Sequence, residues 1–147
     1  MEYINEIFDK IGSDNINYYG QLEPSDKYTQ GIDILYPSTP IKSDNQPAVY
    51  ILTDKSGKLL KIGETQNLTS RFYKAYRCIS NTTNNRIRKF IKEQEDIWVY
   101  VLPLPIVTEK ILGYKCGTSY VKGLEYHLLK EYKDRYQKVP PLNSILS

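Results

Sequence analysis

Apolar residues recur at helical spacing in four parts of the chain. In the first, Ile4, Ile7 and Ile11 lie three or four positions apart, and Gly12 marks a suitable end. Each segment has one apolar side, so each is expected to pack against a shared core. The predicted helices cover residues 2–11, a segment beginning at Asn67, residues 83–94 and residues 121–136.

Three short apolar runs instead favour β-strands. The sequences VYILT, KLLKIGE and IWVYVLPL are rich in β-branched and aromatic residues, and Pro103 and Pro105 close the last of them. The first two are joined by Asp-Lys-Ser-Gly, which predicts a hairpin turn. Residues 13–47 contain four prolines and are interpreted as an irregular or extended arm.

The order helix, arm, strand, strand, helix, helix, strand, helix indicates a mixed α+β fold. We expect a small, mainly antiparallel, three-stranded sheet flanked by helices. An N-terminal helix and extended arm are assigned to residues 1–47, and a compact domain to residues 48–147. A chain of 147 residues is long enough to bury the core of such a domain.

Composition places the chain among soluble globular proteins, with 40% apolar and 25% charged residues. No stretch approaches 18 consecutive apolar residues, so no membrane partner is expected. The N-terminus carries acids where a secretory signal needs bases, and two cysteines are too few for a disulfide framework. We therefore expect a cytoplasmic protein.

Charge is distributed unevenly, although the formal net charge is +3. Residues 1–47 contain eight acids and three bases, a balance of −5, which leaves +8 for the rest of the chain. Between Thr65 and Lys92, seven bases occur without any acid. Because a solvated helix face usually mixes both signs, this acid-free window favours a surface that binds nucleic acid.

The predicted hairpin brings three reactive side chains together. If Asp54 to Gly57 form a four-residue loop, Tyr50 lies directly opposite Lys61 on one face of the sheet. A three-residue loop with a bulge at Gly57 would shift the register by one and separate the two side chains. Arg71 lies one turn into the helix that follows, near the end of the strand that carries Lys61.

A phenol, an ammonium and a guanidinium in one place suit the hydrolysis of a phosphodiester. Arginine binds phosphate through two parallel donors, and lysine adds a second positive charge. A free phenol has a pKa of about 10, so forming phenolate at neutral pH costs roughly 3 to 4 kcal/mol. Neighbouring cations and a metal ion offset that cost, and a carboxylate is then needed to hold the metal.

The motif VYI at residues 49–51, followed about ten residues later by KIG at residues 61–63 and then by Arg71, resembles the GIY-YIG endonuclease superfamily. The similarity is closest to the branch whose second motif begins with lysine, which includes some type II restriction enzymes. It extends over roughly residues 48–143. The resemblance implies a small sheet flanked by helices and a nuclease that cuts DNA with one divalent metal ion.

The resemblance also implies a role for each matched residue. Tyr50 acts near the attacking water, while Lys61 and Arg71 stabilise charge on the scissile phosphate. Glu125 is the metal-binding glutamate of a later helix. Combined with the acid-free window, the predicted nucleic-acid contacts are Lys74, Tyr76, Arg77, Arg86, Arg88, Lys89 and Asn143.

We predict a metal-dependent endonuclease that acts on double-stranded DNA, uses Mg2+ or Mn2+, and serves as a compact type II restriction enzyme. A restriction enzyme that cuts a palindrome is expected to be a homodimer. The alternatives are a repair or mobile-element nuclease and a module that binds nucleic acid without cutting it. Glu125 favours the enzyme, because a phosphate-binding module gains nothing from a carboxylate at its anion site.

Overall fold

The computed structural model describes residues 2–25, 32–35, 47–68, 71–72, 82–93, 96–102, 110–111, 113 and 121–143. The helices are α1 (Tyr3–Ile11), a short 3-10 helix at Ser13–Asn15, α3 (Thr82–Glu93) and α5 (Val121–Tyr136). The strands are β1 (Asn17–Pro24), β2 (Ile32–Leu35), β3 (Ala48–Thr53), β4 (Leu59–Thr65) and β5 (Ile97–Leu102).

The five strands form one antiparallel sheet in the order β2-β1-β5-β3-β4. This confirms the α+β class and the antiparallel sheet, but the predicted count of three strands was wrong. β1 and β2 come from residues 13–47, which were interpreted as an irregular arm. A register shift between Tyr18 and Gly20 interrupts the alternation of buried and exposed residues in β1, so the sequence there lacks a clear strand period.

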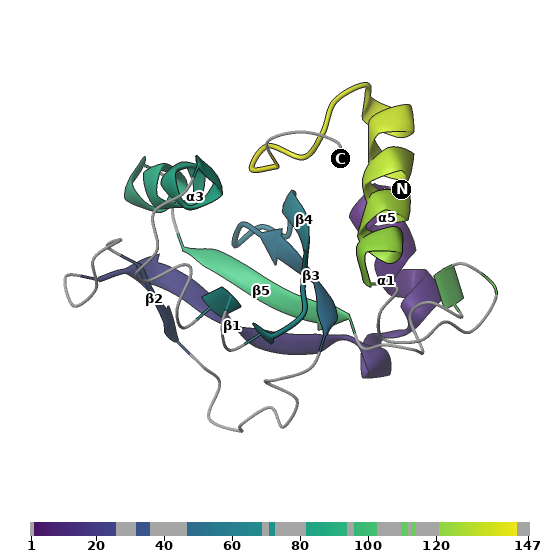
Figure 1. Cartoon of the computed structure of the whole chain (residues 1–147), viewed down its shortest axis with the longest axis horizontal. Helices are drawn as coiled ribbons and strands as arrows, with labels where there is room; N and C mark the ends of the chain where they lie inside the picture. Colours follow the sequence, from purple (N-terminus) through teal and green to yellow (C-terminus); the bar gives the residue numbers. More distant parts are fainter. Residues whose placement is uncertain are drawn as a thin grey trace.

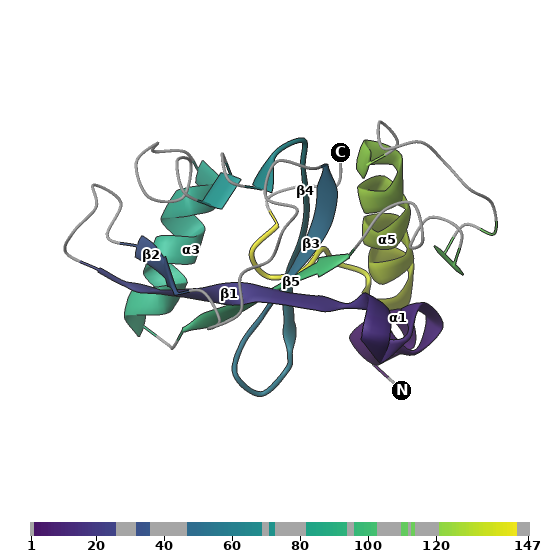
Figure 2. The same ribbon diagram turned by 90° about the horizontal axis from the view of Figure 1, so that it is seen from below.

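Helices cover both faces of the sheet (Figure 1). On one face, Ile87 and Ile91 of α3 pack with Tyr50 and Leu52 of β3. On the other face, α1 and α5 pack against the alternate residues of β3 and β4. In both views α3 is separated from the α1–α5 pair, with β3 and β4 between them (Figure 1, Figure 2). None of the described helices is both long and apolar enough to cross a membrane.

Three of the four predicted helices, α1, α3 and α5, agree with the structure to within a residue or two. α1 ends at Gly12, whose φ of 88° is the left-handed conformation that glycine adopts at low cost. Near Asn67, Arg71 N–H donates a hydrogen bond of 3.1 Å to the Asn67 carbonyl, as expected for a helical turn. The rest of that predicted helix, residues 73–80, lies outside the described residues.

Candidate active site at the edge of β4

The hairpin of β3 and β4 differs in register from the prediction. Tyr50 lies opposite Gly63, and Lys61 lies opposite Leu52, so Tyr50 and Lys61 are diagonal neighbours rather than a direct pair. The prediction of a four-residue loop was wrong. Asp54 N–H donates a hydrogen bond to the carbonyl of Lys58, which closes a loop of three residues. Gly57 then adopts a φ of 90°, as the alternative with a bulged loop requires.

A bulge in β4 returns Lys61 to the face that carries Tyr50. The register shifts between Leu52 and Thr53, which leaves Leu60 as an extra residue beside Lys61. Each shift of one residue moves a side chain to the opposite face of the sheet. The shorter loop and the bulge each contribute one such shift, so together they leave Lys61 on its predicted face. Lys61 therefore shares a face with Tyr50, as predicted, although through a different set of strand contacts.

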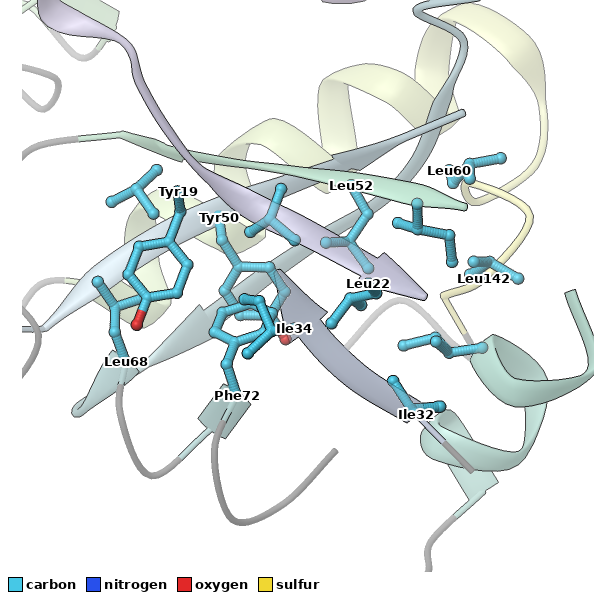
Figure 3. Packing of buried hydrophobic residues seen from close by; sticks show 14 of the residues in the cluster. Tyr19, Leu22, Ile32, Ile34, Tyr50, Leu52, Leu60, Leu68, Phe72 and Leu142 are labelled. Carbon is cyan, nitrogen blue, oxygen red and sulfur yellow. The ribbon is translucent and has the colours of Figure 1, made fainter. Parts of the chain in front are cut away.

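Gly63 is required by the position of Tyr50. A Cβ atom added at Gly63 would overlap the phenol ring and its hydroxyl oxygen. The ring is 1% exposed and meets the ring of Phe72 edge-on, with the centroids 5.2 Å apart. Figure 3 shows Tyr50 in the core beside Phe72, whose ring also lies 5.3 Å from that of Tyr19. The second motif therefore needs glycine because the first-motif tyrosine occupies the space of a side chain.

Lys61 is held in an environment that opposes its charge. Lys61 is 8% exposed, and burial lowers the pKa of its ammonium group to about 8. Arg71 and Arg86 lower this pKa further, while the carboxylate of Glu125 raises it. At pH 7 Lys61 is thus mainly protonated, but it gives up its proton far more easily than an exposed lysine does.

Glu125 lies where α5 meets the edge of β4. Burial raises the pKa of its carboxyl above the usual range, and the neighbouring carboxylate of Glu64 raises it further. Lys61, Arg71 and a hydrogen bond from the backbone N–H of Glu64 act in the opposite direction. Lys61 and Glu125 thus lie close enough to affect each other's pKa, and the partly buried Arg71 lies close enough to affect both.

The outward backbone groups of β4 are satisfied by segments far away in sequence. Leu142 N–H donates to the Leu60 carbonyl at 2.8 Å. The side-chain amide of Asn143 bonds to both Ile62 backbone groups, accepting from its N–H at 3.0 Å and donating to its carbonyl at 2.9 Å. Together with Glu125 at Glu64, these contacts cover alternate residues of an edge strand, and such coverage protects an edge from unwanted pairing.

Asn143 is therefore engaged with the strand rather than exposed to solvent. Asn143 is 7% exposed, and both polar groups of its side chain form hydrogen bonds with the backbone of Ile62. Its own carbonyl accepts a hydrogen bond of 3.0 Å from Nη1 of Arg86 on α3. The yellow segment after α5 crosses over β4 towards α3 (Figure 1). Asn143 thus links α3 to the strand that carries Lys61.

The predicted nucleic-acid contacts fall into two groups. Lys74, Tyr76 and Arg77 lie outside the described residues. On α3, Arg86 and Lys89 are exposed and Arg88 is partly buried. Arg86 and Lys89 line a shallow cavity of about 270 Å³ together with Phe90, Glu93 and the segment at residues 141–142. The described part of the basic surface therefore adjoins the segment that covers β4.

Comparisons with known proteins show similarity at the level of fold. No protein-family model matches the chain, and no curated protein matches it in sequence. Among solved structures, the chain is similar to one described as restriction endonuclease HPY188I in complex with product DNA. The TM-score is 0.51 at 20% sequence identity, and the match covers 95% of this chain and 84% of the other. This chain shares the fold of that enzyme.

The structure adds Glu64 to the residues that sequence reasoning selected. It directly follows Gly63 in β4, and its Oε2 atom is buried without a hydrogen-bond partner in the described part of the chain. The sequence offered one weak signal, an acid immediately after the KIG motif. Within the described residues, no group of three or more histidine, cysteine, aspartate or glutamate residues surrounds a metal-sized space.

Proposed function

We propose that the chain is a metal-dependent endonuclease that hydrolyses DNA phosphodiester bonds, of the GIY-YIG type and with the role of a compact restriction enzyme. The observation that carries the proposal is the convergence of Lys61, Arg71 and Glu125 at the edge of β4. The fold shared with a restriction endonuclease whose structure contains product DNA supports it.

The donor set fits a hard divalent cation such as Mg2+ or Mn2+. Glu125 offers carboxylate oxygens, which such cations prefer to nitrogen or sulfur ligands. A buried carboxylate oxygen on the adjacent Glu64 is free of hydrogen bonds in the described chain, which leaves it able to bind a cation. When bound, the metal would polarise the scissile phosphate and lower the pKa of water.

The cationic side chains bind the scissile phosphate and stabilise its charge. Arg71 binds the non-bridging oxygens through its planar fork, which holds the phosphate in one orientation. Lys61 stabilises the negative charge that develops as water attacks phosphorus and the bond to the leaving oxygen breaks. Its low pKa also makes Lys61 a suitable proton donor to that oxygen.

Tyr50 is assigned the position next to the attacking water. Its ring orientation is fixed by Phe72 on one side and by the missing side chain of Gly63 on the other. A side chain held this firmly loses no further conformational entropy when the substrate binds. The hydroxyl then accepts a hydrogen bond from the water or, as phenolate, takes its proton.

DNA binding is assigned to the basic surface of α3 and to the acid-free window around it. Neutralising phosphates releases counterions, so affinity should fall steeply as salt rises. A restriction enzyme that reads a palindrome would act as a homodimer, which light scattering of the protein with and without DNA can test.

The decisive experiment is to incubate the purified protein with plasmid and phage DNA, with and without Mg2+. Glu125→Gln removes the metal-binding charge with little change in size, and Asp134→Asn makes the same change at an exposed position of the same helix. We expect metal-dependent cleavage by the wild type and Asp134→Asn, and a loss of at least about 100-fold in Glu125→Gln.

The pattern of products distinguishes the roles. Discrete bands would establish sequence-specific cutting, whereas nicks or smears that vanish in Glu125→Gln would indicate a repair or mobile-element nuclease. If the wild type leaves DNA intact but retards it on a gel, the nuclease proposal fails and a binding module replaces it.

A further inference from the structure

Glu64 occupies an unusual position for an acidic residue. It lies opposite Val49 in the hairpin, on the face of the sheet that packs against α1 and α5. Its Oε2 atom is buried, and no hydrogen-bond donor in the described chain reaches it. Burying an ionised oxygen without a partner is costly, so proteins usually pair such an oxygen or bind it to a metal ion.

The backbone fixes Glu64 beside the carboxylate of Glu125. Glu64 N–H donates a hydrogen bond to that carboxylate, so the two residues are joined through the edge of β4. Two carboxylates held side by side repel each other unless a cation lies between them. In the described structure, Lys61 and Arg71 act on Glu125, but neither is bonded to Oε2 of Glu64.

Counting formal charges supports a second carboxylate at this site. The carboxylates of Glu64 and Glu125 balance the two cations Lys61 and Arg71. A divalent metal then leaves two positive charges, which equal the two negative charges that a phosphodiester carries once water has lost a proton and added to phosphorus. Proteins commonly bind Mg2+ through one or two carboxylates, with water and substrate phosphate completing the coordination.

We propose that Glu64 is a second metal-binding residue, whose Oε2 atom holds the same Mg2+ or Mn2+ ion as the carboxylate of Glu125. This inference rests on the proposed function, since it adds a ligand to the same site. Glu64 reaches the ion from strand β4, and Glu125 reaches it from helix α5. The ion thus joins the hairpin that carries Lys61 to the helix that closes the site.

The test measures metal binding directly and in the absence of DNA. Mn2+ is titrated calorimetrically into the wild type, Glu64→Gln, Glu125→Gln and the exposed control Asp134→Asn. We expect Glu64→Gln and Glu125→Gln each to weaken Mn2+ binding by at least about tenfold, because each removes one of two charged ligands. Asp134→Asn should bind as the wild type does.

Thermal unfolding provides a second measurement that also reports whether each variant folds. A ligand that binds the folded protein raises its melting temperature, so a given excess of Mn2+ should stabilise the wild type more than Glu64→Gln. Without metal, Glu64→Gln should melt close to the wild type, because the amide is similar in size to the carboxylate.

Three results would overturn the inference, and they separate it from the nuclease proposal. The first is that Glu64→Gln binds Mn2+ as tightly as the wild type while Glu125→Gln binds it weakly. Glu125 would then be the metal ligand without Glu64. No Mn2+ binding by the free wild type would refute a preformed pair of ligands, even if the protein cuts DNA. Cleavage by Glu64→Gln with an unchanged Mg2+ requirement would do the same.

Discussion

Replacing Lys61 by methionine should stabilise the protein while removing its activity. Lys61 is 8% exposed, and its pKa falls from 10.5 to about 8. A fall of about 2.5 in pKa, at about 1.36 kcal/mol per unit, means that its charge costs about 3 kcal/mol in the folded state at pH 7. This net figure already includes the attraction to Glu125.

Methionine has a similar length, no charge and enough flexibility to fill the same space. We therefore expect the free energy of unfolding of Lys61→Met to exceed that of the wild type by about 3 kcal/mol at pH 7. For a chain of this size, the melting temperature should rise by roughly 6 to 12 °C. Urea unfolding at pH 7 gives the first number, and thermal unfolding gives the second.

The pH dependence tests the cause. Between pH 8 and pH 10.5 the unfolded wild type keeps the proton on Lys61 while the folded protein loses it. The unfolded state then binds more protons, so the stability of the wild type rises with pH in that interval. The advantage of Lys61→Met should be full below pH 8 and nearly absent at pH 10.5.

Lys58→Met is the matched control, since Lys58 is an exposed lysine at the base of the same hairpin. It should change stability little at either pH. If Lys61→Met is no more stable than the wild type at pH 7, or if its advantage stays constant up to pH 10, the charge of Lys61 is not strained and the reasoning fails.

Further predictions concern the geometry, the ionisation and the binding surface of the same site. Gly63→Ala should lower stability by about 1 to 3 kcal/mol, because its methyl group overlaps the ring of Tyr50; an unchanged urea midpoint would contradict this. Asn143→Ala should leave the edge of β4 without its side-chain partners and reduce both the melting temperature and cleavage; the idea fails if activity persists while β4 amides stay protected from hydrogen exchange. Cleavage rates should fall on the acid side at a pH above 4.5, as Glu125 gains a proton, and on the alkaline side near pH 8, as Lys61 loses one; Lys61→Arg should move the alkaline limit upward, and a flat profile would refute the assignment. DNA affinity should drop about 10³-fold or more between 50 and 200 mM salt if six or more phosphates are contacted; filter binding checks this, and a shallow slope would exclude α3 as the main surface.

Much of the fold could be predicted because several segments have a regular period. α1, α3, α5 and β5 begin and end within two residues of their predicted bounds. β1 and β2 were missed because β1 carries a bulge that breaks its alternation, while β2 has four residues. Such short or irregular strands are stabilised by their neighbours in the sheet rather than by their own sequence pattern.

The candidate site shows a different limit. The shared face of Tyr50 and Lys61 was predicted, but the predicted hairpin register was off by two residues. Two shifts that cancel leave no trace in the pattern of faces, so sequence alone could not reveal the bulge at Leu60. Glu64 was missed because its significance depends on where α5 lies, and contacts between distant segments have no local sequence signal.

The coverage of β4 also has a consequence for how the protein is made. The hairpin with Lys61 is synthesised early, whereas Glu125 and the residues that pair with the strand edge follow much later. A nascent chain that has emerged only as far as α3 therefore has the cationic residues without the carboxylate of α5. Such a chain also lacks β5, which pairs with both β1 and β3, so the site can assemble only after β5 and α5 have been made.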